Sequence, residues 1–201
     1  MDEADKRRVG EEVEPGGRPK APGRLELLQR FVNTHNHDLP RAWDRIGTGD
    51  RAREWLRRKG LLAPGDRVSD ADAARLRELR EAIRALALAN HGEPPPAAAV
   101  EVIRAAAGHA RLRVVVDGAG RTGLEPARTG VDGAVATLLG ILHDAQLGGQ
   151  WPRLKGCRQC GYAFFDRSRN RSATWCAMAI CGNRTKNRAY YRRRRPASAA
   201  G

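Results

Sequence analysis

Four cysteines in two close pairs near the C-terminal end constrain this 201-residue chain more than any other feature. Two residues separate the first pair, fifteen lie between the pairs, and four separate the second pair: Cys157, Cys160, Cys176 and Cys181. Two such pairs on separate turns can supply the four thiolates of a tetrahedral Zn²⁺ site. Gly161 and Gly182 follow the two pairs, where glycine suits tight turns. The spacing therefore predicts one structural zinc ion with a closed coordination sphere.

Three other uses of these cysteines remain open from the residues alone. Two disulfides would require an oxidising compartment, which the charged start of the chain, without an apolar signal segment, argues against. An iron–sulfur centre could use the same four thiolates. A redox Cys-x-x-Cys pair normally lies in a βαβ unit, and the sequence predicts none here. Zinc is the interpretation that we favour.

The positive charge of the chain is concentrated in the cysteine-containing third. The whole chain has a net charge of +14, and residues 151–201 contain 13 Lys and Arg against a single acid, Asp166. This segment therefore contributes +12, and the first 150 residues are nearly neutral. A strongly basic module predicts a polyanionic partner, of which nucleic acid is the commonest.

A basic helix is expected after the last cysteine. Asn183 can cap a helix over residues 184–195, which Pro196 ends. Tyr190 and Tyr191 lie between its cations and could stack on unpaired bases. We expect nucleic acid to contact this helix and the loop between the cysteine pairs through Arg184, Lys186, Arg188 and Arg192, with Arg167, Arg169 and Arg171 as supporting contacts. A solvated tail, an acidic protein or an anionic membrane surface is the alternative, but the helix lacks the apolar face that membrane binding needs.

The first 150 residues predict a mainly helical α+β domain with a β-hairpin. Residues 1–22 contain almost no apolar side chains and are expected to form a disordered tail, as are residues 197–201. Apolar periodicity predicts helices over 24–32, 50–59, 70–91, 97–107 and 131–147, and alternation predicts strands over 112–116 and 121–126. We therefore expect one domain over 23–148, a hinge at Gly148–Gly149, and a small treble-clef or ribbon-like zinc module over 149–196. Phe164, Phe165 and Trp175 are expected to form the core of that module.

Enzyme motifs are absent from the first 150 residues: there is no phosphate-binding glycine loop, no nucleophile elbow and no His-Glu-x-x-His. His35, His37 and Asp38 could form a second metal site, although a solvated loop is the more common use of such residues. A small-molecule pocket could be lined by Asn33, Thr34, Arg80 and Glu81. A helix C-cap and a salt-bridged helix face are the alternative interpretation of those four residues.

The zinc module resembles the CGNR zinc finger of bacterial proteins. The resemblance rests on residues 164–171 (FFDRSRNR), on Trp175-Cys176, and on Cys181-Gly182-Asn183-Arg184 with Lys186. It implies that the four cysteines bind zinc and that the finger binds DNA. The first pair departs from the family's usual Cys-x4-Cys spacing, because only two residues separate Cys157 from Cys160.

The upstream residues resemble the ABATE domain that precedes this finger in a family of stress-induced transcription regulators. Residues 31–34 (FVNT) resemble its opening motif, Trp55-Leu56 and residues 60–62 its next segment, and residues 80–83 its central helix. The resemblance covers about residues 24–195. It implies a bacterial transcription regulator that binds DNA through the finger. From the residues we further expect that it is cytoplasmic and not an enzyme, and that its helical domain binds a small-molecule effector or forms a homodimer.

Two other functions remain open from the sequence. The first is an RNA- or ribosome-associated zinc ribbon. The second is a small-molecule enzyme that carries the finger as an accessory module. No run of about 18 apolar residues is present, so the sequence predicts no transmembrane helix.

Overall fold

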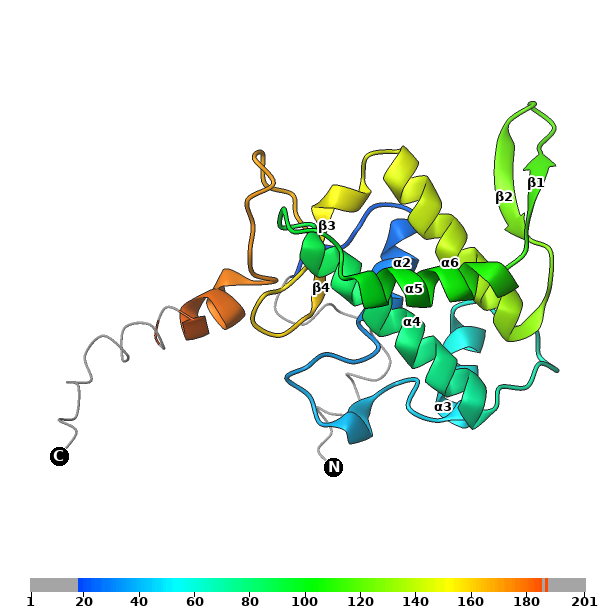
Figure 1. Cartoon of the computed structure of the whole chain (residues 1–201), viewed down its shortest axis with the longest axis horizontal. Helices are drawn as coiled ribbons and strands as arrows, with labels where there is room; N and C mark the ends of the chain where they lie inside the picture. The colour runs from blue at the N-terminus through cyan, green and yellow to red at the C-terminus, as the bar shows by residue number, and fades with distance from the viewer. Residues whose placement is uncertain (1–17, 186, 188–201) are drawn as a thin grey trace.

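The computed structural model describes residues 18–185 and 187, and Figure 1 shows its arrangement. The helices are α2 (Leu25–Val32), α3 (Gly49–Arg58), α4 (Asp70–Ala89), α5 (Ala97–His109) and α6 (Gly130–Leu147). The strands are β1 (Leu112–Val116), β2 (Thr122–Pro126), β3 (Leu154–Gly156) and β4 (Ala163–Phe165), and a short π-helix spans Met178–Gly182. The predicted mainly helical α+β fold with a hairpin and a small four-cysteine module is confirmed.

The long helix α4 lies at the centre of the helical domain, and its start is fixed by local sequence. Ser69 accepts a hydrogen bond from the backbone N–H of Asp72, and the Asp72 carboxylate accepts one from the backbone N–H of Ser69. This capping box satisfies amide groups that the first helical turn leaves unpaired. Apolar side chains on one side of α4, including Leu76, Leu79 and Ile83, pack into a core shared with α2, α3 and α6.

The predicted hairpin β1–β2 packs against α6 and lies at the end of the molecule opposite to the cysteine module (Figure 1). Leu112 packs on the surface of α6 at Gly140, where a Cβ atom would lie 3.7 Å from the end of the Leu112 side chain, an ordinary packing distance. The outer part of the hairpin leaves Val114 and Val116 exposed. Among the helices of the described residues, none combines the length and the apolar character that a membrane crossing needs.

A second hairpin, which the sequence analysis did not predict, joins the cysteine module to the helical domain. β3 pairs antiparallel with β4 through Leu154–Phe165, Lys155–Phe164 and Gly156–Ala163. Leu154, Ala163 and Phe165 belong to the main core, whereas Phe164 packs with the cysteines. Of the three aromatic residues expected to form a separate core for the module, Phe165 therefore lies in the core of the helical domain instead.

Glycine at position 156 permits this close packing. A Cβ atom at Gly156 would lie 2.6 Å from Cγ of Leu88 on α4, so any side chain there would push β3 away from the helix. Because β3 and β4 complete the core of the helical domain, the cysteine module is packed against that domain and does not extend from it on a free linker.

Residues 18–22, which the sequence analysis placed in the N-terminal tail, pack against the body of the protein. Ala21 is buried, and its backbone N–H donates to Oε1 of Gln29 over 2.6 Å. Nε2 of Gln29 donates to the carbonyls of Pro19 and Ala163. One buried amide therefore joins the start of the described chain to α2 and β4, and the rest of the expected tails, 1–17 and 197–201, lies outside the described residues.

Candidate metal centre and its attachment to the helical domain

The four cysteines meet in one buried cluster. Their sulfur atoms all lie within 4.8 Å of one another. The Sγ atoms of Cys160, Cys176 and Cys181 are 3.6–3.8 Å apart. Four thiolates at about 2.3 Å from a tetrahedral Zn²⁺ lie about 3.8 Å from one another, so the spacing of Cys160, Cys176 and Cys181 matches that of zinc ligands. The cluster is a site for one Zn²⁺, held by Cys157, Cys160, Cys176 and Cys181.

The pKa values of the buried thiols also indicate that a cation is needed at this cluster. Burial raises the pKa of Cys181 to about 12, and the hydrogen bond with Cys157 raises the pKa of Cys160. Four neighbouring thiols therefore do not all ionise unless a cation offsets their charge. Because four protein ligands fill the tetrahedral sphere, the zinc has no open position for substrate or water and has a structural role.

Two local structures present the ligands. The first pair lies on the turn between β3 and β4, where the N–H of Cys157 donates to the carbonyl of Tyr162 and the N–H of Gly161 donates to the carbonyl of Cys157. Gly161 has φ +70°, a conformation that favours glycine. We call residues 157–161 the zinc knuckle. Cys176 precedes the π-helix that contains Cys181, so the second pair is brought together by one tight turn of backbone.

Asn183 does not cap the helix that follows. Its backbone angles, φ −64° and ψ −41°, are helical, because the chain is already helical from Met178 onward. An N-cap residue has an extended backbone, so the predicted start of the basic helix at Asn183 is wrong by about one turn.

Arg18 contacts the metal centre from the N-terminal segment. Its Nε donates to Sγ of Cys176 over 3.1 Å, and its guanidinium lies 4.4 Å from the centre of the Tyr162 ring. Zn²⁺ with four thiolates carries a net charge of −2, which a guanidinium in contact with a ligand sulfur partly offsets. Arg18 is therefore a contact of the metal centre that the sequence did not reveal, because it lies in a stretch that was expected to be disordered.

Arg84 attaches the zinc knuckle to the helical domain. Its side chain is 1% exposed and donates to the carbonyls of Gly161 (2.6 Å), Val32 (2.8 Å) and His35 (2.7 Å). Its Nε donates to the carboxylate of Glu81. The five donors of a guanidinium suit such a convergence of carbonyls. The sequence carried one signal for this role, because Arg80 and Arg84 stand four residues apart on the buried side of a predicted amphipathic helix.

Asn33, one of the four residues predicted to line a pocket, joins the finger to α2 instead. It ends α2 as its C-cap residue, and its amide pairs with Ala163 on β4 through two hydrogen bonds of 2.7 and 2.8 Å. This exchange of a donor and an acceptor resembles one rung of a β-ladder. Asn33 is absent from the lining of the groove that contains Arg80 and Glu81.

Replacing Asn33 should therefore destabilise the contact between the finger and the helical domain. We expect Asn33→Leu to lower the free energy of unfolding by about 2 kcal/mol, because the backbone N–H of Ala163 loses its acceptor and the carbonyl of Ala163 keeps only the donor from Gln29. Asn33→Asp, which keeps the acceptor, should cost less. The midpoint of urea unfolding measures this loss of stability. Asn170→Leu, at an exposed position, is the control. Equal midpoints for the two variants would contradict the assignment of Asn33 to the contact between the finger and the helical domain.

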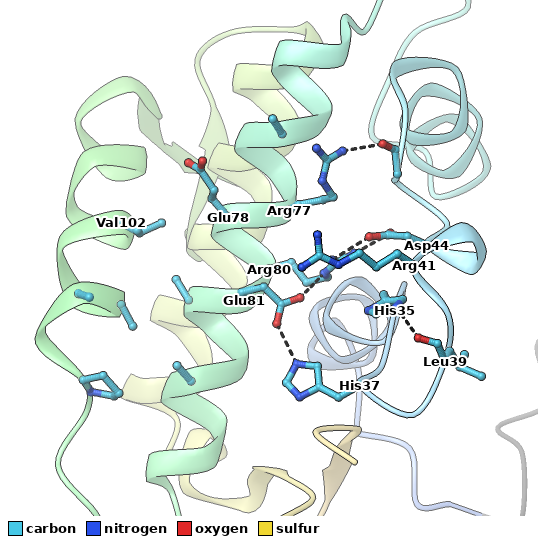
Figure 2. A pocket seen from close by; sticks show the side chains of 17 residues that line it. His35, His37, Leu39, Arg41, Asp44, Arg77, Glu78, Arg80, Glu81 and Val102 are labelled. Atoms are coloured by element: carbon cyan, nitrogen blue, oxygen red, sulfur yellow. Dashed lines mark hydrogen bonds and ion pairs between the residues drawn. The ribbon is translucent and has the colours of Figure 1, made fainter.

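The other three predicted pocket residues, Thr34, Arg80 and Glu81, belong to one hydrogen-bonded network, of which Figure 2 shows Arg80 and Glu81. Arg80 makes a bidentate ion pair with Asp44 at 2.7 and 2.9 Å and also donates to Oγ1 of Thr34 and to Glu81. Burial alone would raise the pKa of Glu81, but the hydrogen bond from Arg84 and the charges of Arg84 and Arg80 hold it at about 2. Arg80 and Glu81 line a groove together with His35 and His37, whereas Thr34 is buried behind Arg80.

The residues considered for a second metal site do not converge. His35 is hydrogen-bonded to the carbonyl of Leu39, His37 to Glu81, and Asp38 to Arg184. Within 18–185 and 187, the cysteine cluster is the only group of three or more potential ligands close enough to hold a metal ion.

The described part of the finger presents the cations of the basic loop, residues 166–173. Arg167, Arg169 and Arg171 are exposed, and Arg167 donates to the carbonyl of Lys20. Arg184 makes an exposed ion pair with Asp38 over 3.1 Å. The remaining predicted contacts, Lys186, Arg188 and Arg192, lie outside the described residues.

Comparison with known families agrees with this two-part arrangement. The family model named ABATE, described as a putative stress-induced transcription regulator, matches residues 25–146, which is more than half of the chain. The model of the CGNR zinc finger matches residues 153–194. A search of curated proteins gave no match. The chain therefore belongs to the ABATE family and carries a C-terminal CGNR zinc finger.

Proposed function

We propose that this protein is a bacterial, cytoplasmic DNA-binding transcription regulator and not an enzyme. In this proposal the finger contacts DNA, and the helical domain receives a small-molecule effector or forms a homodimer. The observation that carries the DNA-binding role is the basic loop, in which three exposed arginines surround a buried acid. The closed sphere of the zinc and the family description support a role other than catalysis.

The only acid of residues 151–201, Asp166, is buried at the start of the basic loop. Asp166 is 1% exposed and accepts hydrogen bonds from Nζ of Lys155 at 2.9 Å and from Ser168 and Ala173. Although burial works in the opposite direction, the bonds from Ser168 and Lys155 lower the pKa of Asp166. Asp166 thus organises the loop while its charge is neutralised internally, and the loop surface carries positive charge alone.

Arg171 shows that the loop has a defined shape. It has φ +51°, a left-handed conformation that is unusual for residues other than glycine. Lys155, anchored by Asp166, also donates to the carbonyl of Arg171. A fixed loop loses less conformational entropy when its arginines meet phosphates, which favours binding.

The salt dependence of DNA binding tests this proposal. In Arg169→Gln/Arg171→Asn, two cations are lost, and asparagine tolerates the left-handed conformation at 171. We expect the slope of log K against log salt to become shallower by about 2, because each phosphate contact contributes about 0.9. Fluorescence anisotropy with a 30-base-pair duplex at several salt concentrations measures the slope.

The matched control is Arg113→Gln/Arg121→Gln, which removes two exposed arginines from the hairpin at the other end of the molecule. Its slope should equal that of the parent protein. An unchanged slope for the loop variant would contradict the assignment of the loop. Tighter binding to single-stranded RNA than to the duplex, in the same assay, would favour the RNA-associated alternative.

A further inference from the structure

A groove of about 1060 Å³ runs across α4 between α5 and the loop of residues 35–47 (Figure 2). We call it the α4 groove. The side next to α5 is lined mainly by small apolar side chains. These belong to Ala82 and Ala85 on α4 and to Pro96, Ala98, Ala99 and Val102 at α5. Such a surface offers contact to an apolar body, and Glu78 is the polar side chain on this side.

The opposite side of the α4 groove is cationic. Figure 2 shows Arg41 extending from the loop toward α4, and Arg77 extending from α4 toward the loop. Arg77 donates to the carbonyls of Ile46 and Gly47. Within the described residues, neither Arg41 nor Arg77 forms an ion pair with an acid.

The acids of the groove leave this cationic end uncompensated. Asp44 is engaged by Arg80 in a bidentate pair, and Glu81 is shared by Arg80 and Arg84. Glu78 projects on the side of α4 that faces α5 (Figure 2). Its negative charge disfavours an anionic group on that side of the groove. The charges therefore predict how a ligand would lie in the groove. Its negative group would lie near Arg41 and Arg77, and the rest of the ligand would pack on the alanine side chains next to α5.

We infer that the α4 groove binds a small organic acid, with its carboxylate between Arg41 and Arg77 and its apolar body on the alanine-rich side next to α5. This inference rests on the effector-binding role proposed above and specifies the class of effector. Guanidinium groups suit carboxylates because their planar donors match the two oxygen atoms.

The wall of the groove is continuous with the metal centre. Nε2 of His37 lies 3.3 Å from the carboxylate of Glu81, and the backbone N–H of His37 donates to the carbonyl of Cys160 over 3.1 Å. Glu81 also binds Arg84, which donates to Gly161 in the zinc knuckle. An acid that orders the loop of residues 35–47 therefore also stabilises the knuckle. By linkage, such a ligand strengthens zinc binding to the same degree as zinc strengthens ligand binding, and we expect the tighter zinc binding to appear as slower zinc release.

Matched probes test the class of ligand. We would measure binding of 4-phenylbutanoate to the zinc-loaded full chain by saturation-transfer NMR and calorimetry, beside its neutral amide, 4-phenylbutylamine and inorganic phosphate. The carboxylate should bind at least about tenfold more tightly than the amide, as expected for a charge-assisted contact. The amine and inorganic phosphate should bind weakly, because the first lacks the negative charge and the second lacks the apolar body.

Two variants and their controls locate the site. Arg41→Gln should weaken binding of the carboxylate about tenfold, whereas Arg45→Gln in the same exposed loop should not. Ala98→Trp should fill the apolar side of the groove and abolish binding, whereas Ala107→Trp, on the opposite face of α5, should have no effect. All four positions are exposed, so the variants should fold.

The second measurement follows zinc release into excess chelator. Saturating 4-phenylbutanoate should slow release from the parent protein at least about threefold, in line with a modest coupling free energy, and should not slow release from Ala98→Trp. The inference would be overturned if the carboxylate and its amide bound with equal affinity. It would also be overturned if neither Arg41→Gln nor Ala98→Trp changed the affinity for 4-phenylbutanoate. Neither readout uses DNA, so loss of DNA binding with intact groove binding would refute only the proposed function. Loss of groove binding with intact DNA binding would refute only this inference.

Discussion

Removal of the zinc should unfold the helical domain together with the finger. A free-standing finger would lose its own structure and leave the larger domain intact. Here the strands that carry the first cysteine pair place Leu154, Ala163 and Phe165 in the main core. Loss of the knuckle therefore also opens the core, and we expect the loss to exceed about 5 kcal/mol, which is comparable to the whole stability of a small domain.

Thermal unfolding of zinc-loaded protein, of chelator-treated protein and of Cys160→Ser measures this effect. The zinc-loaded chain should unfold in one transition, and the other two samples should lose the cooperative transition of α4 and α6 as well. Zinc content, determined by mass spectrometry, reports the occupancy of each sample. The control is Arg158→Ser in the same knuckle, which removes only an exposed ion pair with Glu93.

A zinc-free chain that keeps a cooperative helical transition would contradict this expectation. It would mean that the helical domain closes its core without β3 and β4. Trp55 and Trp151, both buried in the main core, provide a fluorescence signal for that outcome.

Strong local patterns in the sequence predicted the helices and the metal ligands. The α4 helix was visible because Ser69 provides a cap and Leu76, Leu79 and Ile83 recur at helical spacing. The zinc ligands were visible because short spacings between cysteines leave few geometries open. In both cases the residues that determine the structure are close together in the chain.

The attachment of the finger could not be predicted, because it depends on contacts between distant residues. β3 and β4 have three residues each, too few to show alternation. Arg84 lies on the buried side of α4, where an arginine needs hydrogen-bond acceptors, but one of its acceptors, the carbonyl of Gly161, lies 77 positions away in the chain. Arg18 and Ala21 lie at the end of a polar stretch, where composition alone favours disorder.

Arg84→Met should produce the second large loss of stability. Methionine fills a similar volume but donates no hydrogen bond, so the carbonyls of Val32, His35 and Gly161 would be buried without their partner. We expect a loss of about 3–5 kcal/mol in the free energy of unfolding, the usual result of removing one member of a buried charged network. Arg84→Lys should recover only part of this loss, because one ammonium group cannot reach three carbonyls and Glu81 together.

The pKa of Glu81 distinguishes this network from simple loss of packing. In the parent protein Arg84 and Arg80 hold it at about 2, so in Arg84→Met it should rise toward its ordinary value of 4.5. A carboxyl group with a lowered pKa in the folded state contributes stability above its unfolded pKa, and this contribution is lost as the pH falls toward 2. The variant should therefore differ most from the parent protein near neutral pH, with a smaller difference in acid.

Arg75→Met on the exposed side of the same helix is the control, and its loss of unfolding free energy should stay within about 1 kcal/mol. Because Arg84 connects α4 to the zinc knuckle, Arg84→Met should also release zinc faster than Arg75→Met. Equal zinc release from the two variants would mean that the knuckle keeps its shape without this arginine.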